Sequence, residues 1–72
     1  MKENNRNDNF TIHETALIDD SAQIGENVSI GAFSTIGKNT SVGSGSIIEN
    51  NVSIGKDCMI KDDALITSGV KI

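Results

Sequence analysis

Proline, tryptophan and tyrosine are absent from this 72-residue chain, and cysteine and histidine each occur once. A single cysteine excludes an internal disulfide framework. Six lysines and arginines against ten aspartates and glutamates give a net charge of −4, which argues against the basic face that nucleic-acid binding requires. No apolar run is long enough to span a membrane. The composition therefore disfavours disulfide-rich, nucleic-acid-binding and membrane-spanning proteins.

An aliphatic residue stands at every sixth position of the chain. A helix has a period of 3.6 residues and a half-buried strand a period of 2, so neither produces this series. A fixed six-residue period is the mark of a repeat protein and predicts a parallel β-helix. The positions are Ile12, Ile18, Ile24, Ile30, Ile36, Val42, Ile48, Ile54, Ile60, Ile66 and Ile72.

A second, smaller side chain precedes each aliphatic residue from Ile18 onward by two positions. Residues two apart in a strand share a face, so each repeat directs one small and one large side chain inward. Cys58 occupies one of these small positions, and we expect it to be buried and unreactive. Asn, Asp or Gly stands three residues after most of the aliphatic residues, which predicts a tight corner with positive φ.

These six-residue units resemble the hexapeptide-repeat, left-handed parallel β-helix acyltransferase superfamily, in which three units form one triangular coil. The resemblance implies an all-β fold of about three coils with strands stacked eighteen residues apart. We expect residues 1–9 to form a disordered polar arm and residues 10–72 to form a partial β-helix. Ile72 should face inward without a polar cap, which favours the N-terminal part of a longer helix.

Two stretches are similar to nucleotide-sugar N-acetyltransferases in particular: Ile30-Gly31-Ala32-Phe33-Ser34-Thr35-Ile36 and Ile48-Glu49-Asn50-Asn51-Val52-Ser53-Ile54-Gly55. This resemblance implies a homotrimer that moves an acetyl group from acetyl-CoA to an amino group of a nucleotide-linked sugar, with clefts between adjacent subunits. It implies no metal. A cytoplasmic location is expected from the residues themselves, because residues 1–9 lack the apolar core of a secretory signal and only one cysteine is present. We expect the isolated 72 residues to be inactive, because later coils of such enzymes usually carry the catalytic group.

Two alternatives remain open at this point. The first is a non-catalytic β-helix that serves as an assembly or spacer module. The second is a lipid-A type O-acyltransferase, whose opening coils are similar. The reading frame that follows Ile72 would discriminate between an enzyme and an assembly module.

Four residues are candidates for functional roles. His13 is the only histidine and so the only obvious general base, although its corner position favours a structural, edge-capping role. Phe33 places an aromatic ring at a corner where Asn, Asp or Gly is usual, which suggests contact with a neighbouring subunit. Ile47 and Leu65 lie in one outward column eighteen residues apart and are further interface candidates. The catalytic and cofactor-binding residues cannot be assigned from the sequence.

Overall fold

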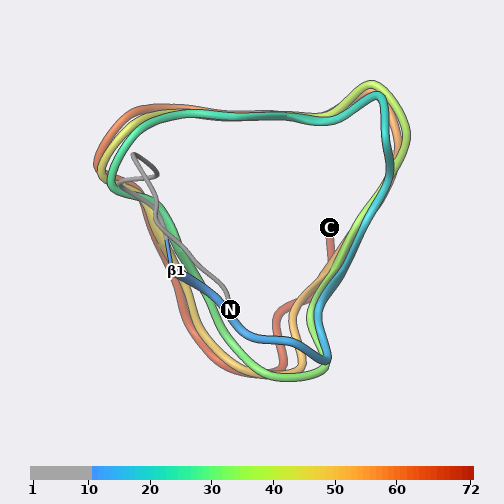
Figure 1. Ribbon diagram of the computed structural model, residues 1–72, viewed down its shortest axis with the longest axis vertical. Coiled ribbons are helices and arrows are strands. Elements are labelled where there is room, and N and C mark those ends of the chain that lie inside the picture. Colours follow the sequence, from blue (N-terminus) through green and yellow to red (C-terminus); the bar gives the residue numbers. More distant parts are fainter. Residues whose placement is uncertain (1–10) are drawn as a thin grey trace, which may run out of the picture.

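The computed structural model describes residues 11–72, which form ten two-residue strands wound into a triangular coil (Figure 1). The predicted polar arm, residues 1–9, lies outside the described residues, as does Phe10. The strands are β1 (Thr11–Ile12), β2 (Leu17–Ile18), β3 (Gln23–Ile24), β4 (Ser29–Ile30), β5 (Thr35–Ile36), β6 (Ser41–Val42), β7 (Ile47–Ile48), β8 (Ser53–Ile54), β9 (Met59–Ile60) and β10 (Leu65–Ile66).

The strands pair in parallel with partners eighteen residues apart, as in Ile12 with Ile30 and Ile30 with Ile48. They form three sheets, one on each side of the triangle: the first sheet is β1-β4-β7-β10, the second β2-β5-β8 and the third β3-β6-β9. Ten strands at three per coil make about three coils. The predicted left-handed parallel β-helix is confirmed.

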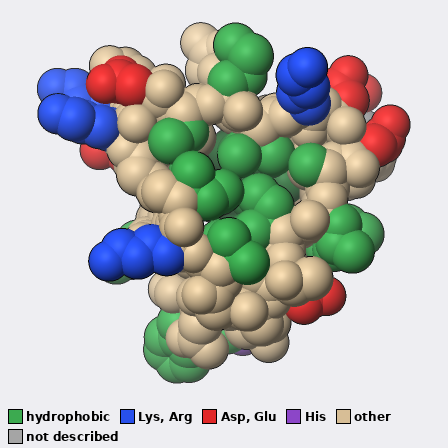
Figure 2. All heavy atoms as spheres, turned by 180° about the vertical axis from the view of Figure 1, so that it is seen from behind, with side chains coloured by type: hydrophobic (Ala, Val, Ile, Leu, Met, Phe, Trp, Pro, Cys, Tyr) green, Lys and Arg blue, Asp and Glu red, His purple; other side chains and the backbone are tan. Residues whose placement is uncertain are grey.

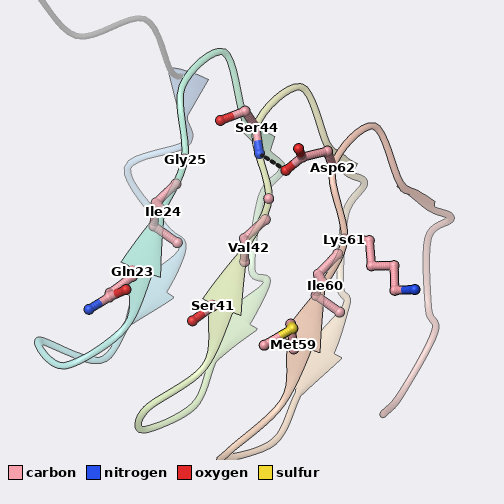
Figure 3. Close-up of a pocket in the computed structure, with 11 residues that line it drawn as sticks. Gln23, Ile24, Gly25, Ser41, Val42, Ser44, Met59, Ile60, Lys61 and Asp62 are labelled. Carbon is pink, nitrogen blue, oxygen red and sulfur yellow. Dashed lines mark hydrogen bonds between the residues drawn. The ribbon is translucent and has the colours of Figure 1, made fainter.

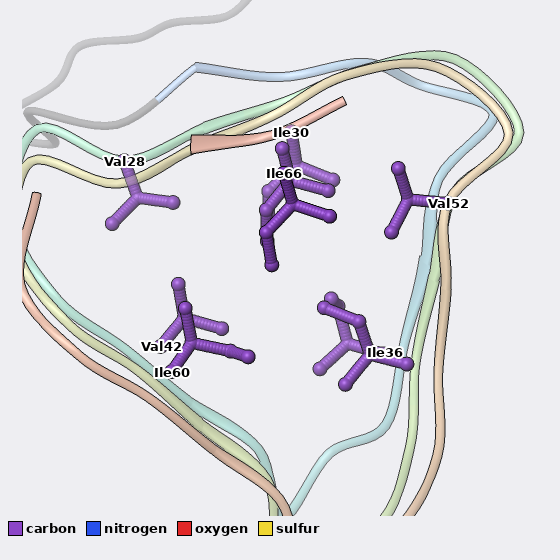
Figure 4. Packing of buried hydrophobic residues seen from close by; sticks show 9 residues of the cluster. Val28, Ile30, Ile36, Val42, Val52, Ile60 and Ile66 are labelled. Atoms are coloured by element: carbon purple, nitrogen blue, oxygen red, sulfur yellow. The ribbon is translucent and has the colours of Figure 1, made fainter. Parts of the chain in front are cut away.

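The aliphatic ladders fill the inside of the triangle (Figure 4). Nine residues form the buried core, namely Val28, Ile30, Ile36, Val42, Ile48, Val52, Ile54, Ile60 and Ile66. Ile12, Ile18 and Ile24 of the first coil are partly buried and pack against this core. Ile72 keeps the register of its ladder, since its N–H donates to Ser53 O and its carbonyl oxygen accepts the Gly55 N–H, yet its side chain is 52% exposed. A ladder residue is covered by the coils on both sides of it, and Ile72 has a coil on one side only.

Three buried hydroxyl groups hold neighbouring coils together. Each occupies the small inward position of the second coil, donates to a carbonyl oxygen fifteen residues later and accepts an N–H eighteen residues later. Ser34 Oγ donates to Glu49 O at 2.6 Å and accepts the Val52 N–H at 3.1 Å. Thr40 and Ser46 repeat this arrangement at the other two sides of the triangle. The small inward position thus serves hydrogen bonding as well as packing. The small size of its residues predicts the packing role only.

Cys58 corrects an expectation from the sequence. It packs against the core from the predicted small inward position, but it is only partly buried. Its Sγ lies 3.4 Å from the Lys56 carbonyl oxygen. Like Ile72, it is covered by a stacked residue on one side only. The end of the molecule in Figure 2 accordingly shows apolar side chains in the middle and charged side chains around the rim.

The corners between the sheets each take three residues after an inward aliphatic residue. The first corner joins the first sheet to the second, the second corner joins the second to the third, and the third corner returns to the first. The expected positive φ is confirmed at Asn27, Asn39, Gly45, Asn51, Asp57, Asp63 and Gly69. Phe33 also has a positive φ, of 61°. This region is strained for a bulky side chain.

Candidate functional site

An open groove of about 760 Å³ runs along the third sheet, across all three of its strands (Figure 3). One rim is the outward column of β3, β6 and β9. The other rim is the third corner, to which the residues after β6 and β9 contribute Ser44 and Asp62. The lining residues are Gln23, Ile24, Gly25, Ser41, Val42, Gly43, Ser44, Met59, Ile60, Lys61 and Asp62.

Two glycines leave the groove free of side chains between its rims. Gly25 and Gly43 take the first position after the inward aliphatic residue, where the next coil has Lys61. A Cβ at Gly43 would overlap the backbone nitrogen of Asp62, so the close approach of the next coil requires glycine there. The N–H groups of both glycines donate to the following coil, to Val42 O and Ile60 O, so they are not free to bind a ligand.

A ladder of side-chain to backbone hydrogen bonds fixes the corner rim. The Glu26 N–H donates to Ser44 Oγ at 3.1 Å, and the Ser44 N–H donates to Asp62 Oδ1 at 2.9 Å. Lys61 borders the groove beside β9, and its side chain extends away from Ser44 and Asp62 (Figure 3). The lining has one positive charge, on Lys61, and one negative charge, on Asp62. Such an open groove with polar rims suits a long, thin ligand.

A smaller hollow, of about 370 Å³, lies on the second sheet. Leu17 and Thr35 form its outward side, and Asp19 and Gly37 border it toward the second corner. Ser21 donates to Asp19 Oδ2 through its hydroxyl at 2.6 Å and its N–H at 3.0 Å. These two bonds, with a smaller effect from Lys38, lower the pKa of the Asp19 carboxyl below its ordinary value of 3.8.

His13 lies at the first corner, away from both hollows, and its Nδ1 is already occupied. The Thr15 N–H reaches Nδ1 at 3.1 Å, so Nδ1 must accept, and these partners assign the ring proton to Nε2. The Thr15 hydroxyl, 2.8 Å from Nδ1, therefore donates to it as well, and accepts the Phe33 N–H at 2.9 Å. Neither ring nitrogen can take a proton from a substrate unless this arrangement breaks. The geometry supports the structural role and weakens the catalytic one.

The three interface candidates are all exposed, and two of them are neighbours. Ile47 and Leu65 pair directly on the first sheet, and their side chains are 46% and 61% exposed. Phe33, 64% exposed, stands at the first corner, which borders that sheet. Leu17 and Met59 are more exposed than these three residues and were not singled out from the sequence. Their outward positions could be predicted, but one apolar residue in a polar column does not define a surface.

Among residues 11–72, no three His, Cys, Asp or Glu side chains converge to hold a metal ion. The same residues include no helix long and apolar enough to cross a membrane.

Comparison with known proteins gives one family match. The family described as bacterial transferase hexapeptide (six repeats) matches residues 21–56, half of the chain. These residues include two of the three strands beneath the groove, β3 and β6. None of the curated proteins compared with the sequence matches it significantly.

Two similar solved structures are of a GDP-perosamine N-acetyltransferase from Caulobacter crescentus, with CoA and GDP-perosamine bound. One has a histidine replaced by alanine and is 16% identical with a TM-score of 0.33; the other has asparagine there and is 19% identical with a TM-score of 0.34. Each alignment covers 86% of this chain and 50% of the solved chain. The present chain thus spans about half the length of these structures.

Proposed function

The chain belongs to the bacterial hexapeptide transferase family, and from this membership we propose that it forms part of an acyltransferase that uses acetyl-CoA. The acceptor that we propose is an amino group on a nucleotide-linked sugar, as the sequence around Phe33 suggests. The enzyme is a cytoplasmic homotrimer in this proposal. The observation that carries it is the family match, whose repeats build most of the groove.

The groove fits the donor better than the acceptor. Acetyl-CoA is a long flexible thioester with phosphates at one end, and the groove is open and crosses three strands. Lys61 offers an ammonium group to the phosphates, beside the opposite charge of Asp62. Ser41 and Gln23 offer a hydroxyl and an amide that can hydrogen-bond to the amide groups of an extended arm.

The reaction needs two further elements. The acceptor nitrogen attacks the thioester carbonyl, a base takes the proton from that nitrogen, and the CoA thiolate leaves. Donors must hold the oxyanion that forms at the carbonyl oxygen. His13 is committed to Thr15, and the Gly25 and Gly43 N–H groups are bonded within the coil. We therefore propose that residues outside this 72-residue chain supply the base.

A transfer assay tests this proposal. Labelled acetyl-CoA is offered with nucleotide-linked amino sugars, with their hydroxyl counterparts and with lipid-A precursors, both to the chain alone and to the product of the complete reading frame that encodes it. We expect N-acetylation by the complete product and none by the chain alone. O-acylation of a lipid-A precursor would instead support the second enzyme class. Absence of any transfer by the complete product would support a non-catalytic assembly module.

A further inference from the structure

Phe33 combines two features that oppose each other in an isolated chain. Its backbone has a φ of 61°, where bulky residues are disfavoured, and its ring is 64% exposed to solvent. The same corner position holds Asn27, Asn39 and Asn51 elsewhere, and asparagine tolerates this φ. A ring that is mostly exposed gains little burial within the chain to offset the strain. Strain of this kind persists where the residue serves a function.

The surface around Phe33 is also poor in charge. Only two of the twelve residues of the first corner are charged, Glu14 and Glu49. The second corner has five charged residues out of nine, namely Asp19, Asp20, Lys38, Lys56 and Asp57. The third has four out of nine, namely Glu26, Lys61, Asp62 and Asp63. Depletion of charge beside exposed aromatic and aliphatic residues is typical of the centre of a protein interface.

The outward column of the adjoining first sheet continues this character. It consists of Thr11, Ser29, Ile47 and Leu65, in register and without a charge. Ile47 lies one coil beyond the coil of Phe33, which is about 4.8 Å along the axis. The length of an aromatic side chain can bridge this offset. A protruding aromatic corner and an apolar face thus occur at nearly the same height on one molecule.

Their directions decide what they can bind. In a triangular cross-section a corner and the side next to it point about 60° apart, and in a closed ring of three copies each copy sees its two neighbours about 60° apart. We propose that Phe33 of one copy packs against Ile47 and Leu65 of the next, three times around a closed ring. The occupant of the apolar face is therefore a second copy of this chain.

This arrangement specifies the contact within the homotrimer of the proposed function. It does not depend on whether the protein transfers an acyl group. Next to the Phe33 contact, on the side away from the centre of the ring, the second sheet of one copy faces the third corner of the next copy. That corner carries Ser44 and Asp62, which form one rim of the groove. The ring thus places the groove beside a cleft between two chains and leaves the second corner in solvent.

Sedimentation velocity of the full chain tests the contact with the variant Phe33→Asn and the matched control Met59→Asn, a change at another exposed apolar residue on the third sheet. We expect the parent and Met59→Asn to sediment as trimers. We expect Phe33→Asn to associate at least about tenfold more weakly, as loss of an interface anchor does. Its thermal unfolding in dilute solution, where each chain is a monomer, should occur at a higher temperature, because asparagine relieves the strain.

Two results would overturn the inference. One is a Phe33→Asn variant that assembles as the parent does. The other is a parent that sediments as a monomer, a dimer or an open series of oligomers. A photo-reactive p-benzoylphenylalanine in place of Phe33 adds an independent check. Its cross-link should join two chains and map to the strand of Ile47 or Leu65, and a cross-link to the third sheet would contradict the contact. Acyl transfer enters none of these measurements, so their outcome is separate from that of the proposed function.

Discussion

His13 and Asp19, six residues apart, make the same hydrogen bonds at consecutive corners of the first coil. His13 Nδ1 accepts the N–H and hydroxyl of Thr15, and Asp19 Oδ2 accepts those of Ser21. The hydroxyls of Thr15 and Ser21 then accept the N–H groups of Phe33 and Asn39 in the next coil. In later coils, a carbonyl oxygen of the preceding coil accepts the corner N–H, as Ala32 O does for Asn51. The side chains of His13 and Asp19 thus provide, for the corner N–H groups of Thr15 and Ser21, the acceptors that carbonyl oxygens provide in later coils.

This equivalence predicts that aspartate can take the place of His13. His13→Ala removes the acceptor for the Thr15 N–H and should lower the free energy of unfolding by about 1 kcal/mol, the usual cost of losing such a cap. His13→Asp should retain most of the stability, because Asp19 fulfils the same role with a carboxylate. Urea unfolding of both variants measures this. A His13→Asp protein as unstable as His13→Ala would show that the capping assignment is wrong.

The same pair of variants distinguishes capping from catalysis. In the product of the complete reading frame, a capping His13 allows His13→Asp to keep its acyl-transfer rate. A catalytic His13 would make both variants inactive while His13→Asp stays folded.

Asp19 should make the stability of the fold decrease at acidic pH. Its folded-state pKa lies below the ordinary value of 3.8, mainly because the Ser21 hydroxyl donates to the carboxylate. The stabilisation is therefore complete well above pH 3.8 and disappears as the pH falls through the lower, folded-state value. Asp19→Asn should be less stable than the parent at pH 7, and the difference should shrink below about pH 4. A difference that stays constant down to pH 2 would contradict this contribution.

The buried hydroxyls should matter more than their size suggests. Ser34→Ala leaves the Glu49 carbonyl and the Val52 N–H without their partner in the core, which should cost about 1–3 kcal/mol. Ser29→Ala is the control, because Ser29 faces outward and its change should stay within about 0.5 kcal/mol. Equal effects of the two changes on urea unfolding would show that the hydroxyl contributes packing alone.

Cys58 should tolerate serine and react with thiol reagents. Its side chain is partly buried at a small inward position, where the second coil has a buried hydroxyl in Thr40. Cys58→Ser should change the unfolding free energy by less than about 1.5 kcal/mol, because the volume is conserved. Native Cys58 should be labelled more slowly than in urea, yet completely, since one side of its coil is uncovered. No labelling over many hours would restore the expectation of a fully buried thiol.

The sequence predicted the architecture almost completely and the site hardly at all. The six-residue series places Ile12, Ile30, Ile48 and Ile66 in one ladder, because periodicity and strand geometry are properties of the chain itself. The predicted burial of Cys58 was wrong, because exposure depends on which coils lie alongside, and Ile72 is exposed for the same reason. The groove could not be predicted, since it arises where Gly25, Gly43 and Lys61 stack across three coils. Its signal was present as two glycines eighteen residues apart, but glycine at that position also serves the close approach between coils.

Titration of the chain with acetyl-CoA, followed by backbone amide chemical shifts, tests the central claim most directly. The account predicts that the largest shifts occur at Ser41, Met59 and Lys61 along the groove. Ser41→Trp should fill the groove and abolish binding, whereas Glu14→Trp at the first corner, which lies opposite the third sheet, should leave the affinity unchanged. Saturable binding that persists in Ser41→Trp, or shifts confined to residues outside the third sheet and its corner, would contradict the assignment of the groove to the acyl donor.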